Sequence, residues 1–370
     1  MTRHGCLRTP VTDVPGLNSL RERCIWVNAQ LKESCMRKTT HPAGTVHRMV
    51  VSSEVLKGNL LGDPTDRVVD VYIPAGYDGA GLPLLVDIVG FTAGGPAHTN
   101  WKGFGENVPE RLDRLIGDGE MPPVVVAFPD CFTRVGGNQY VNSLSTGAWA
   151  DFLTTEMLEA VEGRFGCGGT GRRGIFGKSS GGYGSIVHAL DHSDVWAAAA
   201  CHSGDMAFEL CYLPDMPDTL RALAKGGGTI ESWWTKFEAA PKTPENAFKA
   251  LNIIAMAAHY DPDPHAYLGL RLPVRPDTCE IIPDRWANWM KHDPCVKLET
   301  QSDNLRALKA LYIDCGNSDQ FNLVYGARRF KRRLDELGIA HRYEEFDDNH
   351  SSVDYRMDIS LPFLAKALAG

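Results

Sequence analysis

The segment GIFGKSSGGYGSIVHAL, residues 174–190, predicts a strand, a sharp turn and a helix in direct succession. Apolar residues fill its two ends, and between them stand two adjacent serines, Ser179 and Ser180, with glycines on either side. Either serine could simply cap the helix, because a hydroxyl at that position accepts a hydrogen bond from a free backbone N–H. A strand that turns sharply into a helix is also the setting of a nucleophilic serine. The neighbouring residues distinguish these two interpretations.

The spacing of the glycines favours Ser179 as the nucleophile. The pentapeptide GKSSG matches the pattern G-x-S-x-G with Ser179 at its centre. Strand and helix approach closely in such a turn, so the residues two before and two after the nucleophile must be small. Gly177 and Gly181 meet this requirement for Ser179, whereas Ser180 has Lys178 two positions before it.

Strand-like and helix-like segments alternate along most of the chain. Helical patterns include 150–165 and 321–338. Apolar runs that predict strands occupy residues 49–55, 67–73, 82–90, 122–130, 172–177, 196–204, 310–316 and 341–346. Several of these runs are nearly continuously apolar, as expected for strands buried on both faces. The alternation predicts an α/β fold with a mostly parallel sheet and helices on both faces.

Two regions depart from this alternation and define the expected domains. Residues 1–45 have no sustained periodicity and are expected to form an N-terminal extension. Residues 206–296 are rich in proline and poor in strand signals, which is typical of a large cap or lid insertion. The α/β core is then expected to comprise residues 46–205 and 297–370.

A serine nucleophile needs a base, and His350 is the predicted one. In an α/β fold with a serine on such a strand-to-helix turn, the three catalytic residues follow along the chain in the order serine, acid, histidine. His341 and His350 are the histidines of the last strand–loop unit, but His341 begins the strand. His350 follows the strand, at the carboxyl end of the sheet where such sites form. The alternative is a solvated loop histidine.

The predicted acid is Asp319, which follows the strand at 310–316. Asp314 is the second choice because it still lies within that strand. Asp347 and Asp348 are too close in sequence to the histidine for the usual layout. The alternative role for Asp319 is to cap the helix that begins near residue 321.

Three short motifs resemble one family. FGKSSGGYG, IDCGNSDQF and DNHSS are similar to the esterase D and putative-esterase group of the α/β-hydrolases, which includes S-formylglutathione hydrolases, feruloyl esterases and enterochelin esterases. The segments 70–95 and 140–153 add to the resemblance. It implies an α/β-hydrolase fold with Ser179, Asp319 and His350 as the catalytic triad. Two departures from the group lie beside the nucleophile, at Lys178 and Ser180.

Two further sets of site residues are expected. The backbone N–H of Ser180, directly after the nucleophile, is one expected donor of an oxyanion hole. The resemblance implies the N–H of Phe91 as the other. Candidates for substrate binding are the tryptophans of the insertion, which could line an aromatic or acyl pocket or could form the core of the cap: Trp233, Trp234, Trp286 and Trp289.

The predicted function is that of a serine esterase, a carboxylic-ester hydrolase that acts through an acyl-enzyme on a small-molecule ester. No metal or organic cofactor is expected. An acyltransferase with the same triad is one alternative, and a non-catalytic binding protein on an esterase fold is another.

Charge and composition narrow the expected partners. The formal net charge of -8 argues against a nucleic-acid partner, which would need a basic face. The sequence contains no apolar run of about eighteen residues, so no membrane span is expected. The 10 cysteines form no CxxC pair, and no secretory signal precedes them, so a cytoplasmic protein with reduced thiols is expected. The oligomeric state is left open.

Overall fold

The computed structural model describes residues 41–245 and 247–370. The fold described below is that of the unit Pro42–Gly370. Most of the expected N-terminal extension, residues 1–45, therefore lies outside the described residues. No helix in the described part is long and apolar enough to span a membrane.

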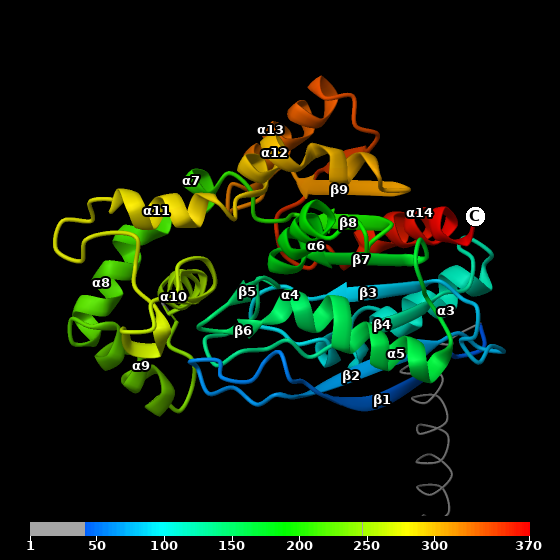
Figure 1. Ribbon diagram of the computed structural model, residues 1–370, viewed down its shortest axis with the longest axis horizontal. Coiled ribbons are helices and arrows are strands. Elements are labelled where there is room, and N and C mark those ends of the chain that lie inside the picture. Colours follow the sequence, from blue (N-terminus) through cyan, green and yellow to red (C-terminus); the bar gives the residue numbers. More distant parts are fainter. Residues whose placement is uncertain (1–40, 246) are drawn as a thin grey trace, which may run out of the picture. The chain divides into compact units, whose positions relative to one another are not determined.

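An eight-stranded sheet forms the centre of the unit Pro42–Gly370, in the order β1-β2-β4-β3-β7-β8-β9-β10 (Figure 1). Its strands are β1 (Thr45–Ser52), β2 (Asp66–Ile73), β3 (Leu84–Ile88), β4 (Val125–Pro129), β7 (Arg173–Lys178), β8 (Ala198–His202), β9 (Ala310–Gly316) and β10 (Arg342–Phe346). β2 pairs antiparallel with β1 and with β4, and all other neighbours are parallel. Each predicted strand has its counterpart here, and the mostly parallel sheet is confirmed.

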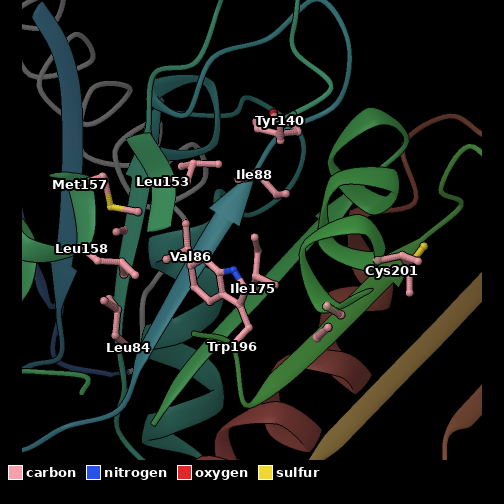
Figure 2. Packing of buried hydrophobic residues seen from close by; sticks show 14 of the residues in the cluster. Leu84, Val86, Ile88, Tyr140, Leu153, Met157, Leu158, Ile175, Trp196 and Cys201 are labelled. Atoms are coloured by element: carbon pink, nitrogen blue, oxygen red, sulfur yellow. The ribbon is translucent and has the colours of Figure 1, made fainter. Parts of the chain in front are cut away.

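Helices cover both faces of this sheet because the side chains of its strands alternate between two cores. In β3, Leu84, Val86 and Ile88 enter one core, whereas Leu85 enters the other. Figure 2 shows Val86 packed beside Ile175 of the next strand in the first core. The first core is closed by helices α5 (Met157–Phe165), α6 (Ser180–Asp191), α12 (Pro294–Arg306) and α13 (Leu323–Glu336), and the second by α3 (Val108–Gly117) and α14 (Met357–Ala369).

A long helical insertion separates β8 from β9, although these strands are neighbours in the sheet. Besides α12, its helices are α7 (Phe208–Cys211), α8 (Met216–Gly226), α9 (Ile230–Ala239), α10 (Phe248–Tyr260) and α11 (Pro283–Met290). Helices α8 to α11 gather on one side of the sheet (Figure 1). A third hydrophobic core holds this group together, with most of α10 buried in it. The expected cap boundary at residue 296 falls inside α12, which packs on α6.

Short elements complete the chain. They are the helices α2 (Pro96–Thr99) and α4 (Trp149–Asp151), the π-helical turn η1 (Phe152–Glu156), the 3-10 turns η2 (Leu213–Asp215), η3 (Tyr267–Gly269) and η4 (Asp354–Arg356), and the two-stranded hairpin of β5 (Asn142–Ser143) and β6 (Gly147–Ala148).

Candidate active site

Ser179 lies on the sharp turn between β7 and α6. Its backbone has φ 59° and ψ -123°, a conformation that is strained for any residue with a side chain. The turn is fixed on both sides, because the N–H of Ser179 donates to the carbonyl of His202 (2.9 Å) and its carbonyl accepts from the N–H of Tyr183 (2.8 Å). The serine side chain is thereby held at the carboxyl end of the parallel strands.

The glycines around Ser179 are required by close backbone approach. A Cβ atom on Gly177 would lie 2.1 Å from the carbonyl oxygen of Ile88, and one on Gly181 would lie 1.8 Å from the same oxygen. The small residues expected from the sequence motif therefore allow α6 to pack against the end of β3. On the other side, a Cβ on Gly90 would be 3.4 Å from the Cβ of Ser179, so the loop after β3 passes directly beside the serine.

His350 and Asp319 form a buried hydrogen-bonded pair. The Nδ1 atom of His350 lies 2.7 Å from Oδ2 of Asp319, and the two residues are 8% and 7% exposed. The other carboxylate oxygen, Oδ1, accepts from the backbone N–H of Phe321 (2.9 Å). Asp319 thus caps the following turn with one carboxylate oxygen and hydrogen-bonds the imidazole with the other.

Asp314, the second choice for the acid, is engaged elsewhere. Asp314 is fully buried in β9, where it pairs with Nδ1 of His202 (2.8 Å) and with Nε of Arg356 (2.9 Å). His202 in turn lies 2.8 Å from the hydroxyl of Ser360 through its Nε2 atom. This trio repeats the residue types of a triad, but it lies within the packing between β8, β9 and α14 and does not line the cavity described below. We therefore treat it as structural.

A cavity of about 300 Å³ opens above Ser179 and His350. Besides these two residues, its walls include aromatic side chains from three different segments: Phe91, Phe248 and Phe321. Their rings form a row, with centroids 6.0 Å apart for Phe91 and Phe248 and 5.9 Å apart for Phe248 and Phe321. The row ends at His350, whose ring centroid lies 4.9 Å from that of Phe321. One wall of the cavity is therefore a continuous apolar surface.

The two expected oxyanion donors both border this cavity. Ser180 is the first residue of α6, and N–H groups at a helix start have no partner within the helix. Phe91 lies in the loop after β3, and its N–H makes no hydrogen bond within residues 41–245 and 247–370. The Ser180 hydroxyl points elsewhere, since it is buried and accepts from Nε2 of Gln139 (2.7 Å).

Charged groups surround the cavity close to the serine. Lys178 lines it and has no ion pair within the described part of the chain, and burial lowers the pKa of its ammonium group. Asp354 also lines it but is paired with Lys102 (2.6 Å). The side chain of His98 is half-buried; burial opposes its protonation, but the Asp87 carboxylate 2.7 Å away outweighs this and raises the pKa of His98.

The four tryptophans of the insertion are not among the residues that line this cavity. Trp233 and Trp234 lie on α9, where Trp233 stacks on Phe237 with a centroid distance of 5.2 Å. Trp286 and Trp289 lie on α11, and Trp289 is fully buried against Tyr260. All four belong to, or pack against, the hydrophobic core of the insertion.

Several lining residues were not identified from the sequence. Phe248 and Asn252 come from α10, whose sequence predicts a helix but not which of its residues face the site. Asp205 and Tyr212 follow β8. The position of Asp205 just beyond a strand was a usable signal, because loops at the carboxyl ends of parallel strands form the site. No group of three or more His, Cys, Asp or Glu side chains in the described part of the chain is arranged to hold a metal ion.

The sheet order, the strand-to-helix turn and the positions of the three loops are those of an α/β-hydrolase. A family model described as Putative esterase matches residues 64–361. The chain therefore belongs to the putative esterase family and is an esterase by class, as predicted. The comparison with curated protein sequences gave no match.

Solved structures share the fold at low sequence identity. A ferulic acid esterase superposes with a TM-score of 0.56 at 18% identity and covers 88% of this chain and 99% of its own. S-formylglutathione hydrolase of Agrobacterium tumefaciens gives a TM-score of 0.55 at 18% identity, with 88% and 96% covered. The fluorophosphonate-binding serine hydrolase F of Staphylococcus aureus gives 0.54 at 15% identity, with 89% and 100% covered. These likenesses confirm the predicted α/β-hydrolase fold.

Proposed function

We propose that this esterase is a serine carboxylic-ester hydrolase whose catalytic triad is Ser179, His350 and Asp319. The observation that carries the proposal is that a serine on a strained turn shares a cavity with a histidine already hydrogen-bonded to a buried carboxylate. Family membership supplies the reaction class, ester hydrolysis. The cavity and its lining supply a place for a small-molecule ester beside the serine.

In the proposed mechanism the Ser179 hydroxyl attacks the acyl carbon while Nε2 of His350 accepts its proton. Asp319 keeps the remaining proton on Nδ1 and stabilises the imidazolium that forms. The N–H groups of Ser180 and Phe91 donate to the oxyanion of the tetrahedral intermediate. The intermediate collapses to an acyl-enzyme as His350 returns the proton to the leaving alcohol. Water, deprotonated by His350, then releases the acid and restores the serine.

We also propose that residues 206–296 act as a cap over this site. The support is that α10 contributes Phe248 and Asn252 to the cavity wall, next to Phe91 from the sheet loops. An insertion that supplies one wall of a cavity limits the size of the ester that can reach the serine.

A covalent label tests the proposed nucleophile directly. A fluorophosphonate probe reacts with an activated serine and adds a fixed mass to the protein. We expect one label per chain, mapped to Ser179 by peptide mass spectrometry, and none in folded Ser179→Ala. Ser351→Ala is the matched control, because Ser351 lines the same cavity and its loss should leave labelling intact. A label on another serine, or none on the folded protein, would contradict the proposal.

A further inference from the structure

Asp205 is a carboxylate in the cavity that the proposed mechanism does not use. It lines the cavity together with Ser179 and His350, yet it is only 8% exposed. Within residues 41–245 and 247–370 its carboxylate accepts one hydrogen bond, from the hydroxyl of Tyr212 to Oδ2 (2.8 Å). An ionised carboxylate can accept about four hydrogen bonds. Most of this capacity is therefore left for a group inside the cavity.

The environment of Asp205 makes an unpartnered charge unfavourable. Burial is the largest influence and raises the pKa of Asp205 to about 6, although the Tyr212 hydrogen bond and the nearby His350 oppose the shift. No ion pair involves Asp205 in the described part of the chain. Near neutral pH the group is nevertheless mostly ionised. A donor on a bound molecule would offset the cost of burying this charge.

A chain of hydrogen bonds holds Asp205 in position from behind. The hydroxyl of Tyr212 lies 3.2 Å from that of Tyr260, which donates to Oε1 of Gln139 (3.1 Å). Nε2 of Gln139 donates to the hydroxyl of Ser180, the residue after the proposed nucleophile. All these side chains are buried. The carboxylate is thus fixed relative to the serine before a ligand binds, which is how selective polar contacts are built.

The cavity offers a second polar side chain with hydrogen-bonding capacity to spare. Asn252 lines it from α10, and its side-chain amide makes no hydrogen bond within the described residues. The row of rings formed by Phe91, Phe248 and Phe321 gives the same cavity an apolar wall. Such a mixture of an apolar wall and a few polar groups with spare hydrogen-bonding capacity fits a ligand that is apolar in one part and carries a hydrogen-bond donor in another.

We propose that Asp205 is a substrate-binding residue that accepts a hydrogen bond from a hydroxyl or ammonium group of the ester. The favoured substrates are then esters that carry such a donor close to the scissile bond. This inference rests on the proposed function, because the donor is placed relative to the bond that Ser179 attacks.

Matched ester pairs test this inference. The acyl arm compares p-nitrophenyl 3-hydroxybutyrate and p-nitrophenyl 3-aminobutyrate with p-nitrophenyl butyrate. The alcohol arm compares 2-hydroxyethyl butyrate with ethyl butyrate. We expect the wild type to favour a donor-bearing ester by about ten-fold or more in kcat/KM in at least one arm, the range that a hydrogen bond to a charged group supplies. The arm and the donor that respond identify which part of the ester contacts Asp205.

Two variants of Asp205 and one control make the test specific. In Asp205→Asn the preference should fall several-fold, and in Asp205→Ala it should disappear. Asp354→Asn should keep the preference, because Asp354 lines the same cavity but is already paired with Lys102. A wild-type preference below about two-fold in both arms, or a preference that survives in Asp205→Ala, overturns the inference.

The pH dependence of the wild-type preference gives a readout that needs no variant. The preference should rise between pH 5 and pH 7.5 as Asp205 ionises, and a preference that is flat or falls contradicts the inference. The pH dependence of the catalytic steps that the two esters of a pair share cancels in the ratio. The titratable groups that interact with Asp205 are His350, Asp319, Tyr183, Tyr212, Tyr260, Cys201 and Cys211. Failure of the proposed function itself would look different, because the folded wild type would then hydrolyse none of these esters.

Discussion

The imidazole of His350 and the carboxylate of Asp319 lie 2.7 Å apart, although 31 positions separate them in the sequence. Their meeting follows from the register of two parallel strands, in which Phe346 of β10 stands opposite Gly316 of β9. Both loops therefore leave the sheet at the same level. A Cβ on Gly316 would lie 2.4 Å from the carbonyl oxygen of Asp348, so glycine is needed for the loops to pack together.

Replacing Asp319 by asparagine should greatly lower the turnover rate without unfolding the protein. Asparagine keeps the shape but can present an amide donor to Nδ1 of His350, which favours the wrong tautomer of the imidazole. A fall in kcat of about 10³- to 10⁴-fold is expected, with a small change in KM. Asp347→Asn is the control, since Asp347 is an exposed aspartate of the loop that carries His350. Equal losses in the two variants would argue against a triad role for Asp319.

Glycine at position 181 should be essential for folding as well as for the turn. In Gly181→Ala the new Cβ would lie 1.8 Å from the carbonyl oxygen of Ile88, a contact that only a backbone shift can relieve. We expect a loss of about 3 kcal/mol or more in the free energy of unfolding, measured with urea. Gly163→Ala in α5, where nothing lies within 4 Å of the added atom, should instead stabilise by about 0.5–1 kcal/mol. A Gly181→Ala variant as stable as the wild type would show that this close approach does not exist.

Aromatic residues of the cavity and of the insertion core should respond differently to truncation. Phe321→Ala removes part of the cavity wall and should raise KM for p-nitrophenyl butyrate several-fold. Trp234→Ala should reduce stability by about 3–5 kcal/mol, because Trp234 is 1% exposed in the core of the insertion, and should leave KM of the folded protein nearly unchanged. A change in KM without loss of stability in Trp234→Ala would place the tryptophans in substrate binding.

The buried carboxylate of Asp205 should make stability depend on pH. Burial raises its pKa from 3.8 to about 6, so between these values the folded protein holds a proton that the unfolded chain has lost. Stability from this group is present in full below pH 4, falls as the pH rises to 6 and stays low above it. The effect amounts to about 3 kcal/mol. Asp205→Asn lacks this titration. Measured by urea unfolding, the free energy of unfolding of the variant should therefore rise relative to that of the wild type from pH 4 to pH 6. A relative free energy that falls over this range would contradict the assignment.

The sheet and the core of the candidate site could be predicted from sequence because both depend on local patterns. Continuous apolar runs such as Val125–Pro129 identify strands buried on both faces, and the glycines around Ser179 reflect a clash at a single carbonyl oxygen. The different places of Asp314 and Asp319 also follow from position, since a residue inside a strand packs within the sheet and one beyond its end reaches the candidate site.

The cavity wall could not be predicted because it depends on how the insertion packs. Helix α10 is almost entirely apolar and mostly buried, so its sequence does not reveal that Phe248 and Asn252 face the serine. The tryptophans of the insertion are candidates for substrate binding because of their size. Large apolar rings serve equally well in a hydrophobic core, which is where Trp234 and Trp289 lie. The roles of Asp205 and Tyr212 depend on hydrogen bonds between segments distant in sequence.

The central claim, that Ser179 is the nucleophile of an ester hydrolase, is tested most directly by p-nitrophenyl acetate hydrolysis. Wild type, Ser179→Ala and Ser180→Ala should be compared at equal concentration, with folding checked by circular dichroism. We expect near-total loss of activity in Ser179→Ala, up to about a million-fold in kcat, and a much smaller loss in Ser180→Ala, whose backbone N–H is retained. Full activity in Ser179→Ala, or a folded wild type that hydrolyses neither this ester nor longer ones, would contradict the claim.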